Sequence, residues 1–375
     1  MRPCRMIPRF SLRTLVVFLL LVTSGMGLWW HWEPWYCERV LRERAGFVSA
    51  AAFSPDGERV VVAGGNETAR IWGVRAGGHP RVLEGHSYDI HSAEFSPDGG
   101  RVVTASGDKT ARIWNADTGK CLRVLKHEDA VCAAAFSPDG ECVVTAGWDK
   151  TARVWDAETG ECLRVLTGHA EEVPSAAFSP DGKRVVTASW DETARIWNWE
   201  TGQCLSILKG HDNGLLCAAF SPNGERAVTA SEDMTARIWD ARAGGCLRVL
   251  SGHSDEICAV AFSPSGERVV TASADGTVRI WDAHAGGCLR VLRGHGEAVW
   301  SAAFSRDGES IVTGSDDFTA RIFRRRRPEW WWGVFWLWEF WLTVALAGVF
   351  AWSVWRDRKF LRRSAAAIIA GEAQA

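Results

Sequence analysis

The sequence predicts an all-β protein: a seven-bladed β-propeller, closed by a strand from the N-terminal side and flanked by two transmembrane helices. Three observations carry this prediction: a repeat of 41 or 42 residues, four short apolar runs within each repeat, and two long apolar segments outside the repeats. At 375 residues the chain exceeds the usual size of one hydrophobic core, unless a ring of small modules supplies it.

The repeat is marked by a phenylalanine that opens an FSPDG-like turn. This phenylalanine recurs at Phe53, Phe95, Phe136, Phe178, Phe220, Phe262 and Phe304. A period of this length is typical of repeat architectures in which each repeat is one supersecondary unit. The sequence therefore contains seven units.

Each unit reads as four short strands. In residues 162–203, the runs CLRVL, VPSAAF, RVVTAS and TARIW are rich in β-branched and aromatic residues, and turn residues separate them. No helical periodicity occurs between residues 37 and 323. Seven units of four antiparallel strands predict a propeller over 37–323 rather than a helical solenoid.

The stretch CERVLRER, residues 37–44, is expected to be the outermost strand of the last blade. Cys37 precedes Phe53 by the same sixteen residues that separate Cys288 from Phe304, and the last repeat ends at Phe323 without an outer strand. A strand from the N-terminal side would close the ring and remove a pair of exposed sheet edges.

Two recurring motifs carry a family resemblance. Gly-His pairs begin at Gly85, Gly168, Gly210, Gly252 and Gly294, and strands end in Trp155-Asp156, Trp239-Asp240 and Trp281-Asp282, with Trp-Asn at 114 and 197. With these motifs, about three quarters of the chain resembles the WD40-repeat family. The resemblance implies a non-catalytic propeller that serves as a platform for partners, so we expect neither enzymatic activity nor a cofactor.

A histidine, a hydroxyl, a turn aspartate and a tryptophan are expected to form a hydrogen-bonded chain inside each blade, because buried polar groups need partners. The candidate structural residues are His86, Asp108, Trp114, His169, Asp191, Trp197, His211, Asp233, Trp239, His253, Asp275 and Trp281. A Ser-His-Asp triad uses the same residue types, but a catalytic set occurs once per protein and this set recurs. The histidines belong to different blades, so we expect no metal site.

The hydroxyl of this chain has two candidates in each blade. Thr187 and Ser189 of the unit at 162–203 project from the same face of their strand. Blade three keeps Thr145 but has Gly147 in the serine position, which favours the threonine.

Three blades depart from the pattern. Blade one has Arg44, Val62 and Asn66 in place of the histidine, threonine and aspartate, so it is expected to lack the chain. Blade seven has Phe323 in place of tryptophan, and blade three has Lys126-His127 for Gly-His.

Partner binding is expected where the repeats differ from one another. In the family that the chain resembles, the loops from strand d to strand a and the turns from strand b to strand c lie on the usual partner face. The candidates at these positions are Trp148, Trp190, Trp300, Phe318 and Met234, since large exposed side chains are typical interface anchors. The alternative is that these loops vary without constraint.

Charge and cysteine content restrict the remaining functions. The net charge of −2 offers no basic field for nucleic acid. The eleven cysteines are odd in number, and those at equivalent places in successive repeats lie too far apart to bridge, so we expect free thiols.

Two apolar segments predict membrane anchors. Residues 14–30 carry no charge and follow a basic tail, 1–13; residues 330–355 carry one, Glu339, and precede a basic tail, 356–375. The first segment has the length of a signal-peptide core as well, but the tryptophans that follow it resemble an interfacial belt and favour an uncleaved anchor.

The two anchors also predict an orientation. Both join the propeller at one corner, so the face with the d–a loops and b–c turns should point away from the bilayer. The basic tails place both termini in the cytoplasm and the propeller outside, whereas Arg324 to Arg327 and the free thiols favour the reverse.

These features together predict a membrane-anchored scaffold that binds a protein or peptide. The alternative is a membrane-bound sensor of a small molecule or glycan at the propeller channel. The sequence makes no prediction of oligomeric state.

Overall fold

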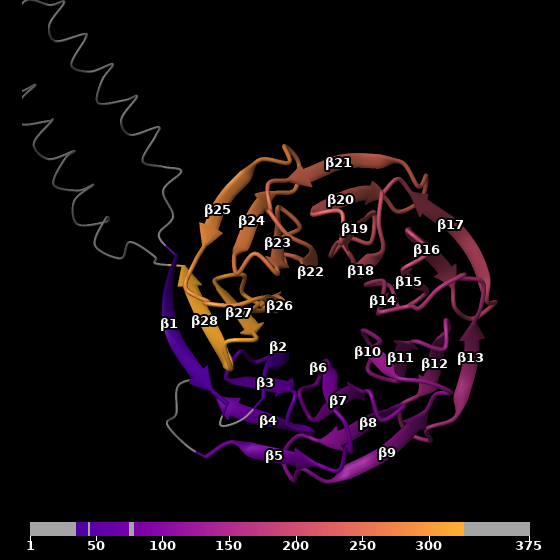
Figure 1. Cartoon of the computed structure of the whole chain (residues 1–375). Helices are drawn as coiled ribbons and strands as arrows, with labels where there is room; N and C mark the ends of the chain where they lie inside the picture. Colours follow the sequence, from indigo (N-terminus) through magenta and orange to yellow (C-terminus); the bar gives the residue numbers. More distant parts are fainter. Residues whose placement is uncertain (1–34, 44–45, 75–78, 326–375) are drawn as a thin grey trace, which may run out of the picture. The chain divides into compact units, whose positions relative to one another are not determined.

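The computed structural model describes residues 35–43, 46–74 and 79–325, which form seven four-stranded antiparallel sheets arranged in a ring (Figure 1). This confirms the predicted all-β, seven-bladed propeller. The strands of each sheet are lettered a to d, from the ring axis outward. Blade one is β2 (Val48–Phe53), β3 (Arg59–Gly64), β4 (Thr68–Gly73) and β5 (Arg81–Glu84); blade two is β6 (Ile90–Phe95), β7 (Arg101–Ser106), β8 (Thr110–Asn115) and β9 (Cys121–Lys126).

The next four blades repeat the same order. Blade three is β10 (Val131–Phe136), β11 (Cys142–Gly147), β12 (Ala152–Asp156) and β13 (Cys162–Leu166); blade four is β14 (Ser175–Phe178), β15 (Arg184–Ala188), β16 (Thr193–Asn198) and β17 (Gln203–Lys209). Blade five is β18 (Leu215–Phe220), β19 (Arg226–Ser231), β20 (Thr235–Asp240) and β21 (Cys246–Ser251). Blade six is β22 (Ile257–Phe262), β23 (Arg268–Ser273), β24 (Val278–Asp282) and β25 (Cys288–Leu292).

Blade seven is assembled from both ends of the described chain. It consists of β26 (Val299–Phe304), β27 (Ser310–Ser315), β28 (Thr319–Arg325) and β1 (Trp35–Arg42), which pairs with β28 as the outermost strand. The pairing runs from Trp35 opposite Arg325 to Arg42 opposite Thr319, and Arg324 Nη1 donates to Glu38 Oε1 at 3.0 Å. The N-terminal strand therefore closes the ring, beginning two residues before Cys37.

The hydrophobic core lies between blades rather than inside them. One layer joins Val103 and Ile113 of blade two to Val131, Phe136 and Trp155 of blade three, and equivalent layers occur around the ring. Each blade thus depends on its neighbours, as expected for repeat proteins.

Arginines at the start of strand b clasp the following blade. In blade one, the Arg59 guanidinium lies 5.3 Å from the Phe95 ring centroid and donates to the Gly99 carbonyl at 2.8 Å. Arg101, Arg184 and Arg226 make the same pair of contacts with the next blade. The clasp combines a cation–π contact with a charge-assisted hydrogen bond.

Blade three lacks the clasp, because Cys142 stands in the arginine position. There the indole N–H of Trp199 donates to the Gly182 carbonyl at 2.8 Å, and its ring packs edge-on to Phe178 with centroids 6.3 Å apart. Trp199 of blade four therefore takes over the carbonyl and the aromatic contact that an arginine of blade three would make.

The predicted membrane segments cannot be compared with this fold. Within 35–43, 46–74 and 79–325, no helix is long and apolar enough to cross a membrane. Both predicted spans, 14–30 and 330–355, and both tails, 1–13 and 356–375, lie outside the described residues. The cysteines within the described ranges are all free.

Candidate partner interface

A hydrogen-bonded chain runs through blade two. The Trp114 indole N–H donates to Thr104 Oγ1 at 2.9 Å, Thr104 Oγ1 lies 2.7 Å from His86 Nε2, and His86 Nδ1 lies 2.7 Å from Asp108 Oδ2. The threonine has one proton, so it donates to Nε2, and Nδ1–H donates to the carboxylate. Burial lowers the pKa of His86, which favours the neutral ring that this arrangement requires.

The same chain occurs in blades three to six, with the threonine in the central place in every case. The members are His127, Thr145, Asp149 and Trp155; His169, Thr187, Asp191 and Trp197; His211, Thr229, Asp233 and Trp239; and His253, Thr271, Asp275 and Trp281. Lys126 in place of glycine thus leaves the chain of blade three intact.

The serine of the same strand has a different role. Ser106 Oγ donates to the Tyr88 carbonyl at 3.0 Å and accepts from the Asp108 amide at 3.1 Å. It therefore ties the d–a loop to the b–c turn, outside the His–Thr–Trp path.

Blades one and seven lack parts of the chain. In blade seven, His295 still contacts Thr313 and Asp317, but Phe323 offers no N–H. In blade one, Val62 replaces the threonine, and the buried indole nitrogen of Trp72 has no partner among the described residues. Arg44 lies outside the described residues.

These chains are enclosed by protein. The side chains of His86 and Thr104 have no exposed surface, and that of Asp108 is 5% exposed. A substrate has no access to the hydroxyl, so the geometry suits a structural role that joins strands b and c to the preceding loop.

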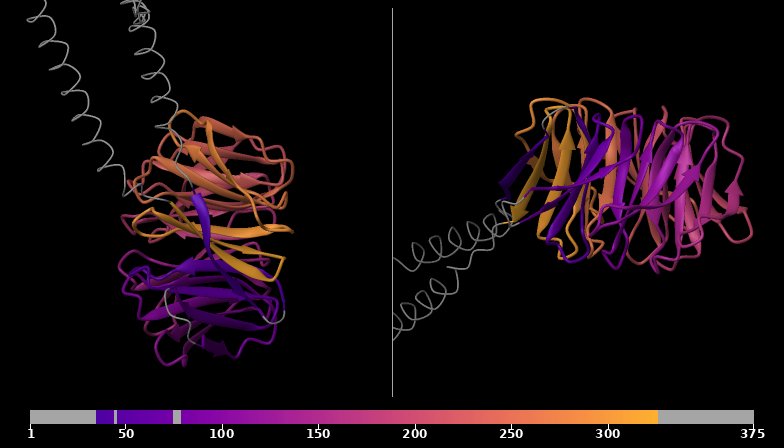
Figure 2. Two further views of the ribbon diagram at one scale, coloured as in Figure 1. Left: turned by 90° about the vertical axis from the view of Figure 1, so that its left-hand side faces the viewer. Right: turned by 90° about the horizontal axis from the view of Figure 1, so that it is seen from below.

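The d–a loops and b–c turns lie together, at one end of the strands. In successive blades the first turn residue donates its backbone N–H to the d–a loop; Trp148 bonds to the Ala130 carbonyl at 2.9 Å and Trp190 to the Glu172 carbonyl at 3.0 Å. We call this surface the histidine face, and the surface of the SPDG-type a–b turns and the c–d turns the proline face. Seen edge-on, the strands run between the two faces (Figure 2).

The b–c turns hold a side chain outward in a left-handed backbone conformation. The residue after the turn aspartate has a φ of 64° at Met234 and 62° at Phe318, whereas blade six has Gly276 there. A non-glycine residue in this region costs about 1 kcal/mol. The same conformation occurs at Glu67, Lys109, Lys150 and Glu192 in blades one to four, so it is a property of the turn and not of the residue in it.

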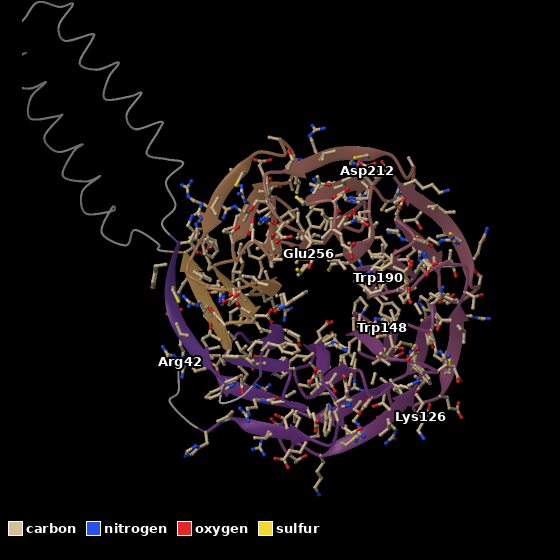
Figure 3. All side chains as sticks on the ribbon, in the orientation of Figure 1. Arg42, Lys126, Trp148, Trp190, Asp212 and Glu256 are labelled. Atoms are coloured by element: carbon tan, nitrogen blue, oxygen red, sulfur yellow. The ribbon has the colours of Figure 1, made fainter. Side chains whose placement is uncertain are left out.

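Two tryptophans of adjacent blades meet on the histidine face. Trp148 and Trp190 are 44% and 39% exposed, and their ring centroids lie 6.4 Å apart at an interplanar angle of 43°. Figure 3 places both beside the central opening of the ring. The remaining candidates belong to other blades: Met234 to blade five, and Trp300 and Phe318 to blade seven.

Trp300 is less available than its companions. It is half-buried, and its indole N–H donates to Asp316 Oδ1 at 2.7 Å. Met234 and Phe318 are 45% and 54% exposed. The exposed apolar surface is therefore built from Trp148, Trp190, Met234 and Phe318 rather than from Trp300.

Tyr88 was missed by the sequence comparison of the blades. It is 60% exposed on the d–a loop of blade two, and its ring lies on Gly107, where a Cβ would come within 2.5 Å of Tyr88 Cδ1. Phe47 covers Gly65 of blade one in the same way. The sequence pattern that could have identified Tyr88 is a glycine at the first position of the b–c turn together with an aromatic residue in the preceding d–a loop.

Carboxylates surround the aromatic residues. Apart from Glu43, which pairs with Arg70, the acidic rim comprises the carboxylates of the d–a loops and b–c turns that do not bond to a blade histidine: Glu67, Asp89, Glu128, Asp129, Glu171, Glu172, Glu192, Asp212, Glu232, Asp255, Glu256, Glu297 and Asp316. Two lysines share these loops, and each pairs with an acid of the rim: Lys109 with Asp129 at 3.3 Å and Lys150 with Glu171 at 2.9 Å.

In blades five and six, carboxylates of the rim lie close enough to repel one another. Burial, and then the neighbouring charges of Glu232 and Asp255, raise the pKa of Glu256. Figure 3 shows Glu256 beside the central opening, whereas Lys126, on an outermost strand, lies at the periphery of the ring. The acidic rim therefore reaches the central opening at Glu256, whereas Asp212 lies farther out, toward the periphery of the ring.

One carboxylate lies deeper, on the innermost strands. Glu94 of β6 occupies a register that alanine holds in the other six blades: Ala52, Ala135, Ala177, Ala219, Ala261 and Ala303. Glu94 is half-buried. Its burial removes water from the carboxylate and raises the pKa of Glu94 to about 8.

Comparison with known proteins identifies the repeats. The family described as WD domain, G-beta repeat matches seven segments: residues 35–73, 77–115, 119–156, 160–198, 202–240, 244–282 and 286–324. Each segment joins the outermost strand of one blade to the three inner strands of the next. A search of curated proteins returned no match to the chain.

Proposed function

The chain belongs to the WD-domain, G-beta repeat family, whose propellers are generic protein-interaction scaffolds and typically non-catalytic, and on this premise we propose that it is a membrane-anchored scaffold that captures a protein or peptide on its histidine face. The observation that carries the proposal is the pair of exposed indoles, Trp148 and Trp190. Large aromatic side chains near the centre of a surface are the usual anchors of an interface.

The place where the propeller begins and ends supports membrane anchoring. Trp35 pairs with Arg325, at the ends of β1 and β28 that lie on the proline face. Segments 14–30 and 330–355 therefore connect to the propeller at one corner. Anchored there, the ring presents its proline face to the bilayer and its histidine face away from it.

The basic tails support an orientation with both termini in the cytoplasm and the propeller outside. Exposed cysteines on the outermost strands, such as Cys121 and Cys246, offer a test. In intact cells, a membrane-impermeant maleimide should label these thiols. Labelling only after the cells are permeabilised would contradict the proposed orientation.

The scaffold function is tested by crosslinking and affinity capture of the full chain from native membranes. Trp148→Ala/Trp190→Ala should lose the captured partner. The matched control is Leu205→Ala/Leu247→Ala, which removes apolar side chains of similar exposure (49% and 42%) from the outermost strands. Equal capture by the wild type and the tryptophan variant, or equal loss in the control, would refute the proposed face.

Glu94 favours one alternative, a sensor of a small molecule or glycan at the channel. It is the one carboxylate on the described innermost strands, and a ligand with a hydrogen-bond donor or a positive charge would complement it. One variant distinguishes the sensor function from the scaffold function. Glu94→Ala should abolish small-molecule binding if the sensor function holds and should leave partner capture intact if the scaffold function holds.

A further inference from the structure

Resting on the proposed scaffold function, we propose that the partner docks through a basic segment, whose lysine or arginine side chains lie on Trp148 and Trp190 and are neutralised by the acidic rim. The occupant is thus a cationic peptide, either free or part of a protein. Aromatic surface, charge balance and the layout of one subsite each point to this chemistry.

The aromatic surface suits a cation. Indole is the best of the aromatic partners for ammonium and guanidinium groups. Two such cation–π contacts occur within the protein: Arg59 lies over the Phe95 ring and Arg101 over the Phe136 ring, each 5.3 Å from the ring centroid. Across 35–43, 46–74 and 79–325, no cation occupies the faces of Trp148 or Trp190, so these indoles are open to one from outside.

The charge balance differs between the two faces. On the proline face the arginines of the strand b clasp lie among the acids; Arg59 pairs with Asp117 at 3.2 Å, and Arg184 with Asp181 at 3.9 Å. On the histidine face, the described loops carry Lys109 and Lys150, which are paired with acids of the rim, and Arg293; the other acids of the rim outnumber these three cations. Such a face attracts cations and repels the phosphates of lipids and nucleic acids.

One subsite brings both features together. The Trp190 ring lies against the loop of blade five, with its Cδ1 atom 3.2 Å from the place that a Cβ of Gly214 would take. The carbonyl of Gly214 accepts the backbone N–H of Glu232 at 3.0 Å. A long basic side chain lying on Trp190 therefore has Glu232 as the neighbouring counter-charge, and Asp255 and Glu256 follow in the next blade.

Crowded carboxylates also gain from a cationic ligand. Burial is the largest cause of the raised pKa of Glu256, and Glu232 and Asp255 raise it further because the three like charges repel one another. A lysine or arginine brought to this place relieves that repulsion, which adds to the attraction of each individual pair.

The test measures binding of three fluorescent 12-residue peptides to the detergent-solubilised full chain by anisotropy. The peptides share one apolar framework and carry six Lys, six Gln or six Glu at the same positions. The Lys peptide should bind the wild type most tightly and weaken as salt is raised, because exposed charges are screened. Equal binding of the Gln or Glu peptide would overturn the inference.

Variants assign the binding to the histidine face. Glu232→Gln/Glu256→Gln should weaken the Lys peptide about three- to tenfold, and Trp190→Ala by a similar factor. The control is Asp139→Asn/Glu141→Gln, which removes the same number of charges from the proline face and should leave the affinity unchanged. Equal losses in the control and the rim variant would overturn the inference.

Failure here is distinguishable from failure of the scaffold function. If Trp148→Ala/Trp190→Ala loses the membrane partner but the peptides show no preference for positive charge, the face is a docking site and the inference of a basic segment is wrong. If that variant keeps its partner, the scaffold function on this face fails as well.

Discussion

The threonine at the centre of each hydrogen-bonded chain offers the sharpest test of the fold. In blade five, Thr229 Oγ1 accepts from the Trp239 indole at 2.8 Å and lies 2.7 Å from His211 Nε2, and the threonine is fully buried. Thr229→Val keeps the shape but leaves two buried polar atoms without partners. Each unsatisfied group costs about 1–3 kcal/mol, so the free energy of unfolding should fall by about 2–4 kcal/mol.

Blade one allows the reverse substitution to be tested. Val62 occupies the threonine position there, and the Trp72 indole nitrogen is buried without a partner among the described residues. Val62→Thr supplies the missing oxygen and should stabilise the protein by about 1 kcal/mol. The gain is smaller than the loss in blade five because the histidine and aspartate of the chain are absent.

Both variants are measured by urea denaturation of the full chain in detergent, followed by circular dichroism. Thr229→Ser serves as the control, since it keeps the hydroxyl and loses only a methyl group. A loss below about 1 kcal/mol for Thr229→Val, or a larger loss for Thr229→Ser, would show that the chain is not what holds the blade.

Two further predictions concern the channel and the blade three–four seam. The pKa of Glu94 is about 8 in the fold and 4.5 in the unfolded chain, so the folded state binds the extra proton between these values and stability falls as pH rises through this window. The wild type should lose on the order of 2–4 kcal/mol of its free energy of unfolding between pH 5 and pH 9 in urea denaturation, and Glu94→Gln should abolish this loss. The same pH dependence in both proteins would contradict this. Trp199→Ala removes the contacts to Phe178 and Gly182 and should lower the free energy of unfolding by about 2–4 kcal/mol. Adding Cys142→Arg should rebuild the arginine clasp and restore part of this stability. A double variant no more stable than Trp199→Ala would refute the idea that Trp199 replaces the arginine.

Features that depend on local spacing were predictable from the sequence. The seven blades, the closing strand from the N-terminal side and the threonine as the central hydroxyl all follow from comparing equivalent positions in successive repeats. The departure of blade one, through Val62 and Asn66, was visible for the same reason.

Features that depend on side-chain contacts rather than on spacing were not predictable. The role of Trp199 becomes evident only when Cys142 of the preceding blade is placed beside it. The sequence does not show which side chains of an innermost strand the neighbouring blade buries, so Glu94 was overlooked. Tyr88 was missed because equivalent positions of the blades were compared one at a time. An aromatic residue on this face comes from the b–c turn in some blades and from the d–a loop beside it in blade two.

The central claim, that the histidine face captures a basic partner, is tested most directly by photo-crosslinking in native membranes. Benzoylphenylalanine replaces either Glu192, exposed on the histidine face, or Asp181, exposed on the proline face, and the crosslinked peptide is identified by mass spectrometry. We predict adducts from position 192 alone, with the crosslink in a segment rich in lysine or arginine. Adducts from position 181 alone, or an acidic segment at position 192, would contradict the claim.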